Sequence, residues 1–130
     1  MKTTLFLFLL TFTVAFAASA QDTEKGKVYS EVEVMPQYPG GQEALFKFIS
    51  ENVTYPQNAH KNNIEGKVFV QFIVDKKGAV TNAKVVRGVD PDLDKEALRV
   101  INLMEKWTPG KNKGKTVKVK YTIPINFALK

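Results

Sequence analysis

The segment Thr116–Phe127 limits the fold of this 130-residue chain more than any other part of it. Apolar residues occupy every second position, and polar residues or a proline stand between them. Because neighbouring side chains of a strand point to opposite faces of a sheet, the pattern predicts a long final strand with one face in the core and one in solvent. The predicted solvent face consists of Lys118, Lys120, Thr122, Pro124 and Asn126.

Pro124 lies inside this predicted strand. A proline has no backbone N–H to give to a second neighbour, so it is tolerated on edge strands and not on inner ones. The last strand is therefore expected at an edge of its sheet. An edge strand offers a row of unpaired backbone donors and acceptors to another chain. The sequence thus predicts a surface that binds a partner by strand pairing.

Two shorter strands and the turn between them are predicted before the last strand. Residues 68–74 and 79–87 are predicted to form a hairpin, with Asp75–Gly78 as its turn and Gly78 at positive φ. The last strand is placed beside the first strand of this hairpin. We therefore predict an α+β domain with a three-stranded antiparallel sheet in the order second–first–third, packed by two helices.

The two packing helices have separate start signals. Helical spacing of apolar residues begins at Gln42 and ends before Tyr55-Pro56, after which a short helix is expected over Gln57–Asn62. The main helix is predicted to start at Asp90-Pro91, where the aspartate caps free amides and the proline fits the first turn. Trp107 follows it as a large core residue, and Thr108–Lys115 is expected to be a basic loop.

The N-terminal residues resemble an export signal rather than a part of the fold. Lys2 precedes an apolar run, and Ala18-Ser19-Ala20 forms a small-residue cleavage site. We expect residues 1–20 to be a signal peptide that directs the protein to the periplasm, with an uncleaved membrane anchor as the alternative. Residues 21–35 are expected to be a lead-in with an extra strand near Val28–Val34, and residues 36–130 the domain.

The residue types give little support for catalysis. The chain has one histidine and no cysteine, so a histidine-based triad, a thiol nucleophile or a multi-histidine metal site cannot be assembled. Gly114-Lys115-Thr116 lacks the earlier glycine of a phosphate-binding loop. The acidic residues after Val89 fail as a calcium loop, because Lys95 replaces its glycine and Ile101 its glutamate. We expect no enzyme activity, no cofactor, no metal and no small-molecule substrate.

A basic run passes through the last loop and strand. Its lysines can protect the exposed strand from aggregation, or dock an acidic segment or an anionic envelope polymer. Nucleic acid is not expected as a partner, because no aromatic residues alternate with the lysines on that face. The run consists of Lys111, Lys113, Lys115, Lys118 and Lys120.

Taken together, these motifs resemble the TonB C-terminal domain family over about residues 36–130. The residues that carry the resemblance include Tyr55-Pro56, Ile64–Val68, Trp107, Pro109–Lys111 and Ile125-Asn126. The resemblance implies a domain for energy-coupled transport that binds the TonB box of outer-membrane TonB-dependent transporters, adding it as a strand beside the last strand. It also implies that the residues just before Tyr55-Pro56 contact the box. The implied partner-binding residues are Asn52, Val53, Thr54, Tyr55, Lys118, Lys120, Thr122, Pro124 and Asn126.

Two alternatives concern other partners. The basic strand and loop can belong to a structural adaptor that binds peptidoglycan or another anionic envelope polymer. The strand near Val28–Val34 can lie on the free edge of its own chain or of a second copy, which would mask the site or form a homodimer.

Overall fold

The computed structural model describes residues 26–130. The expected signal peptide, residues 1–20, lies outside the described residues, as does the first part of the expected lead-in. Within residues 26–130, no helix is long and apolar enough to cross a membrane.

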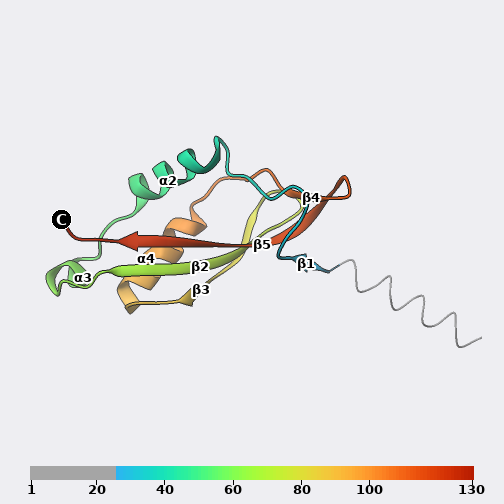
Figure 1. Cartoon of the computed structure of the whole chain (residues 1–130). Coiled ribbons are helices and arrows are strands. Elements are labelled where there is room, and N and C mark those ends of the chain that lie inside the picture. The colour runs from blue at the N-terminus through green and yellow to red at the C-terminus, as the bar shows by residue number, and fades with distance from the viewer. Residues whose placement is uncertain (1–25) are drawn as a thin grey trace, which may run out of the picture.

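The described chain forms three helices and a mixed sheet of five strands (Figure 1). The α+β class is confirmed. The strands run in the order β1–β5–β2–β3, and β4 pairs with β5 outside this path. The elements are β1 (Val28–Tyr29), α2 (Gly41–Asn52), α3 (Gln57–Lys61), β2 (Gly66–Val74), β3 (Val80–Arg87), α4 (Pro91–Asn102), β4 (Gly110–Asn112) and β5 (Lys115–Phe127).

The sheet is larger than predicted. Strand β2 pairs antiparallel with β3 on one side and with β5 on the other, and its pairing with β5 runs without a break from Gly66–Phe127 to Val74–Val119. The short strand β1 adds a parallel pair to the far side of β5, and β4 adds an antiparallel one. The prediction of a three-stranded, purely antiparallel sheet was therefore wrong in extent.

The β2–β3 turn forms as the sequence predicts. Gly78 has φ 89°, in the left-handed region that glycine adopts without strain. The Asp75 carboxylate accepts hydrogen bonds from the backbone N–H groups of Lys77 and Ala79, at 2.9 Å each. These bonds hold the turn closed, so the two strands of the hairpin are fixed in register at this end.

Helix α4 covers one face of the sheet. The Asp90 carboxylate caps it by accepting from the N–H groups of Asp92 and Leu93, and Pro91 occupies its first turn, as expected. Figure 1 shows α4 passing behind β5 and β2. The strand residues that face the helices are fully buried; they include Val68, Val70, Phe72, Val74, Ile123 and Ile125. Within residues 26–130, no helix covers the opposite face of the sheet.

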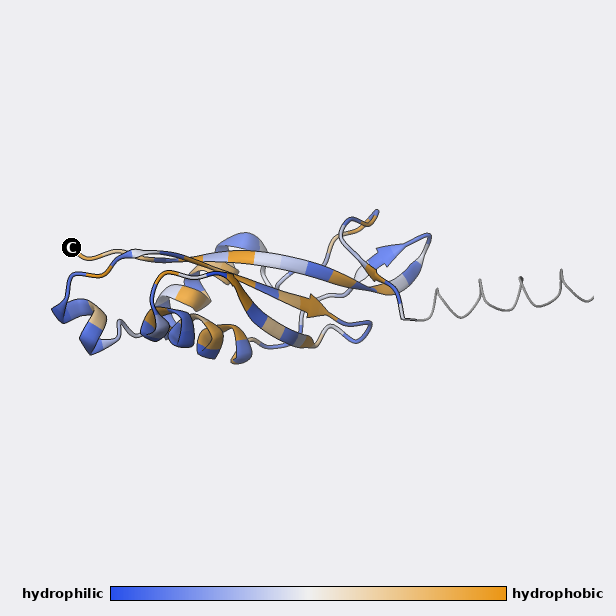
Figure 2. Ribbon diagram, turned by 90° about the horizontal axis from the view of Figure 1, so that it is seen from below, coloured by the Kyte–Doolittle hydropathy of each residue, from blue (hydrophilic) through white to orange (hydrophobic). Residues whose placement is uncertain are grey.

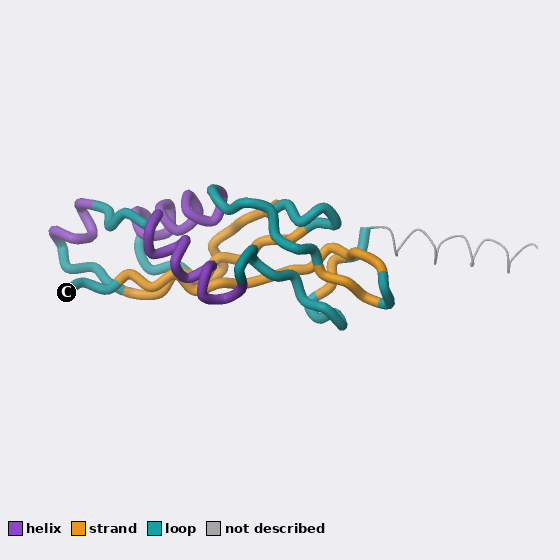
Figure 3. The backbone as a smooth tube through the Cα atoms, turned by 90° about the horizontal axis from the view of Figure 1, so that it is seen from above, coloured by secondary structure: helices purple, strands orange, loops and turns teal. Residues whose placement is uncertain are grey.

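The hydrophobic and polar colours alternate along β5 (Figure 2), as the sequence pattern requires. Figure 3 shows that the helices gather at the end of the sheet near the C terminus, while the β4–β5 hairpin projects at the other end. The two ends of β5 therefore have different surroundings.

The segment before α2 and the predicted basic loop pair with each other. Backbone hydrogen bonds of 2.8 and 3.0 Å join Val34 to Lys111, and bonds of the same lengths join Gln37 to Thr108. The expectation of a loop over Thr108–Lys115 was wrong, because β4 lies within it. The expected strand Val28–Val34 is reduced to β1 and the bridge at Val34. Trp107 is 3% exposed, five residues beyond the end of α4.

Candidate partner-binding edge

The outer edge of β5 is free over Lys120–Phe127, which we call the open edge. Strand β2 pairs with this stretch on one side. Among the described residues, the only other strand of the main sheet that meets β5 on this side is β1, whose paired residues on β5 are Lys118 and Val119, before this stretch. Side chains on the core face of this stretch, such as Ile123, Ile125 and Phe127, are buried and fix its position. The open edge is thus a rigid stretch of eight residues with one unpaired side.

Other parts of the same chain bound the open edge at both ends. At its start, β1 pairs with β5, with Val28 opposite Lys118 and Tyr29 opposite Val119. At its end, the ring of Tyr55 lies edge-on against Phe127, with centroids 5.7 Å apart. The Tyr55 hydroxyl donates a hydrogen bond to the carbonyl oxygen of Ile64 just before β2. A strand added to the open edge would therefore run between β1 and Tyr55.

Helix α4 holds the connection that leads to Tyr55. An Arg99 guanidinium nitrogen donates to the carbonyl oxygen of Asn52 at 2.7 Å, and the Thr54 N–H donates to the Glu96 carboxylate at 2.6 Å. Arg99 and Glu96 also form an ion pair at 2.7 Å. The hydrogen bond from Arg99 lowers the pKa of the Glu96 carboxyl below its ordinary value; burial opposes this shift, and the Thr54 N–H adds to it. The carboxylate is therefore held in its charged form.

The structure divides the predicted partner-binding residues into three groups. Lys120, Thr122, Pro124 and Asn126 lie on the open edge with exposed side chains. Lys118 is half-buried and already paired with Val28, so its backbone on the side of β5 away from β2 has a partner within the chain. Tyr55 closes the far end, and the residues before it, Asn52, Val53 and Thr54, are tied to α2 and α4.

Sequence reasoning missed Glu96 and Arg99. Their spacing of three residues on α4 predicts that they contact each other. Nothing in the local pattern relates them to Asn52 and Thr54, which lie 47 and 42 residues earlier than their respective partners. Only the packed fold brings these groups together.

Helix α2 lies beyond the open edge. Figure 1 shows it above β5, on the side away from β2. It is anchored through the buried side chains of Leu45 and Ile49, whereas Phe46 is 54% exposed. A strand added to the open edge would therefore have α2 as its other neighbour.

The predicted basic run is split between two regions. Lys111 and Lys115 are exposed in the β4–β5 hairpin, and the Lys113 N–H at its tip donates to the Glu33 carboxylate at 2.6 Å. Lys118 and Lys120 lie further along β5, at the start of the open edge. Among the described residues, no group of three histidine, aspartate or glutamate side chains is placed to hold a metal ion.

Comparison with known proteins identifies this arrangement. The family model described as Gram-negative bacterial TonB protein C-terminal matches residues 51–129. An NMR solution structure of the Helicobacter pylori TonB C-terminal domain is 32% identical in sequence to this chain, with a TM-score of 0.52. The alignment covers 65% of this chain and 77% of the Helicobacter pylori chain. A shorter form of the same domain is 30% identical, with a TM-score of 0.49, and covers 68% of this chain and 92% of that chain. No curated protein sequence matches the chain.

Domains of this family are periplasmic interaction domains, and they interact with TonB-dependent transporters of the outer membrane. The matched residues contain the open edge, Tyr55 and both residues of the Glu96–Arg99 pair, whereas β1 and most of α2 lie before the match. The chain belongs to the TonB C-terminal domain family.

Proposed function

We propose that this protein binds the TonB box of outer-membrane transporters by adding it as a strand to the open edge, in support of energy-coupled transport. The observation that carries the proposal is the free side of Lys120–Phe127, in a family whose members interact with these transporters. Main-chain hydrogen bonds supply the affinity in such a mode, and alternate side chains supply the specificity.

The added strand would be short. The open edge has eight residues, and β1 and Tyr55 lie at its ends. A strand of this length buries little surface, so the complex belongs to the small and transient class of interfaces. Fast release suits a partner that has to be engaged and freed repeatedly.

Strand addition is tested by titrating the protein with a TonB-box peptide and following its backbone amides by NMR. Amide signals of Lys120–Phe127, Tyr55 and α2 should shift. Two matched peptides carry methyl groups on alternate backbone nitrogens, one on the odd and one on the even positions. Only one set of N–H groups faces β5 in a strand, so one methylated peptide should lose binding and the other keep it. Equal binding of all three peptides, or no shift at about 1 mM peptide, would reject the proposal.

We also propose that residues 1–20 are a cleaved signal peptide and that residues 21–130 act in the periplasm. The proposal rests on the apolar run and the small residues that follow it, together with the periplasmic character of the family. The intact mass of the protein, isolated by cell fractionation, tests it. A periplasmic product that begins at Gln21 is expected, and a product that keeps Met1 in the membrane fraction would show an anchor instead.

A further inference from the structure

The strands of the sheet carry charge of one sign. Strands β2, β3 and β5 contain six basic residues and no aspartate or glutamate. The positions that face the helices are apolar and buried, so the charged side chains lie on the uncovered face of the sheet or at the strand ends. The six are Lys67, Lys84, Arg87, Lys115, Lys118 and Lys120.

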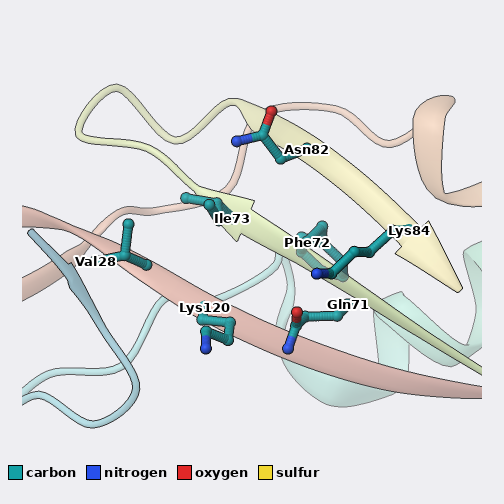
Figure 4. Close-up of a pocket in the computed structure, with 7 residues that line it drawn as sticks. All are labelled: Val28, Gln71, Phe72, Ile73, Asn82, Lys84 and Lys120. Carbon is teal, nitrogen blue, oxygen red and sulfur yellow. The ribbon is translucent and has the colours of Figure 1, made fainter. Parts of the chain in front are cut away.

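A hollow of about 260 Å³ lies on this uncovered face, where four strands meet (Figure 4). Lys84 and Asn82 come from β3, Gln71 and Ile73 from β2, Lys120 from β5 and Val28 from β1. Gln71 is directly opposite Lys84 in the β2–β3 ladder, and Ile73 is directly opposite Lys120 in the β2–β5 ladder. The two lysines are thus fixed on opposite sides of β2.

The hollow has the composition of a carboxylate site. The ammonium groups of Lys84 and Lys120 are charged donors, and the amides of Gln71 and Asn82 are neutral ones. Within the described residues, neither lysine forms an ion pair, and the one ion pair lies on α4. Val28 and Ile73 supply apolar walls, which reduce the exposure of a bound group to water and strengthen its attraction to the lysines.

The hollow is continuous with the open edge. Lys120 is the first residue of the open edge, and Val28 belongs to the strand that ends it. A peptide added along Lys120–Phe127 would leave the sheet at this point and pass the hollow. Its own side chains on the uncovered face would then lie next to those of Lys120 and Thr122.

From this placement we propose that the hollow binds acidic side chains at one end of the same peptide that pairs with the open edge. This inference rests on the proposed function and adds the chemistry of the partner: an extended segment with carboxylates at the end nearest Lys120. The gain from two partly exposed charge pairs corresponds to about a three- to tenfold increase in affinity. It should shrink as the salt concentration rises, because these charges are near the surface.

The experiment compares TonB-box peptides that differ only at their ends. One pair carries Asp-Asp or Asn-Asn at the N terminus, and a second pair carries the same residues at the C terminus. Titration calorimetry should show tighter binding for the Asp-Asp peptide at one end only, with the advantage reduced at high salt. The peptide end at which Asp-Asp increases the affinity also shows whether the added strand runs parallel or antiparallel to β5.

Two double variants locate the effect. Lys84→Gln with Lys120→Gln should remove the advantage of the Asp-Asp peptide over the Asn-Asn peptide, and both peptides should still bind through the main-chain hydrogen bonds of the open edge. Lys67→Gln with Lys47→Gln removes the same charge from the far end of the sheet and from α2, and should keep the advantage. The inference would be overturned if Asp-Asp increased the affinity equally at both peptide ends or at neither end. It would also be overturned if both double variants lost the advantage of the Asp-Asp peptide to the same extent. Binding of the Asn-Asn peptides would still support strand addition, whereas loss of all binding would reject the proposed function itself.

Discussion

Gly78 lies directly against the backbone of Trp107. Its carbonyl oxygen accepts a hydrogen bond from the Trp107 N–H at 2.8 Å, and a Cβ atom at Gly78 would lie 1.9 Å from the Trp107 carbonyl oxygen. Trp107 in turn packs among aromatic rings, with centroid distances of 5.4 Å to Phe72 and 5.1 Å to Tyr121. This contact joins the β2–β3 turn to the residue that leads into β4, and thereby holds the end of the sheet where β1 meets β5.

Gly78→Ala should destabilise the fold strongly. The alanine would take a positive φ and force two backbone segments apart, so we expect a loss of about 3 kcal/mol or more in the free energy of unfolding. Gly114→Ala is the matched control, because Gly114 also has a positive φ, 78°, but no atom within 4 Å of the added Cβ. It should cost about 1 kcal/mol. Urea unfolding measures both, and equal losses would show that the contact with Trp107 has little weight.

Tyr55 should stabilise the end of the open edge through two separate contacts. Tyr55→Phe keeps the ring against Phe127 and removes the hydroxyl that donates to Ile64, whereas Tyr55→Leu removes both contacts. Thermal unfolding should give the order wild type, Phe variant, Leu variant, with a loss of a few degrees in Tm for the Phe variant. A Phe variant as unstable as the Leu variant would assign the whole effect to the hydroxyl.

Glu96 should make stability depend on pH in the acid range. Its pKa in the folded protein lies below its ordinary value, chiefly because Arg99 donates to the carboxylate. A carboxyl with a lowered folded pKa stabilises the fold above its unfolded pKa, and this stabilisation is lost as the pH falls through the folded pKa. Glu96→Gln should therefore be less stable than wild type at pH 7, and the difference should narrow below about pH 4.

The control for this pH dependence is Glu43→Gln, which removes an exposed carboxylate from the first turn of α2. Its unfolding curve should stay close to that of the wild type at both ends of the pH range. A difference between Glu96→Gln and wild type that is the same at pH 3 and pH 7 would show that the charge of Glu96 is not responsible.

The elements that were predicted from the sequence are those with a local signal. The alternation in Thr116–Phe127 places Ile123 and Ile125 in the core, and the cap at Asp90 starts α4 at Pro91. Each of these features depends on residues within a few positions of one another. They follow from the periodicity of strands and helices and from the geometry of caps.

The elements that were missed depend on pairing between distant segments. Strand β4 is only Gly110–Asn112 and has no apolar alternation, so its pairing with β5 leaves no local pattern. The bridges of Val34 and Gln37 to the same segment are backbone contacts, which any residue type can form. The same holds for the candidate site. Its exposed edge followed from Pro124 and the alternation, whereas the pairing of Lys118 with Val28 required the fold.

Strand β1 should set the limit of the partner's footprint. It pairs with Lys118 and Val119, so a peptide that binds the wild-type protein should shift amide signals from Lys120 onward and leave those two residues unchanged. Val28→Pro with Tyr29→Pro removes both backbone donors of β1 and prevents its pairing. In this variant the peptide-induced shifts should extend to Lys118 and Val119.

The control Val28→Ile with Tyr29→Phe keeps β1 intact and should show the wild-type footprint. If the peptide shifts Lys118 and Val119 equally in wild type and in the proline variant, β1 is displaced on binding and does not act as a limit. If the proline variant binds no peptide although its spectrum remains folded, β1 contributes directly to the site. Only a set of shifted amide signals that lengthens when β1 is lost agrees with an open edge that begins at Lys120. In that case Lys118 and Val119 lose their pairing with β1 and pair with the added peptide instead.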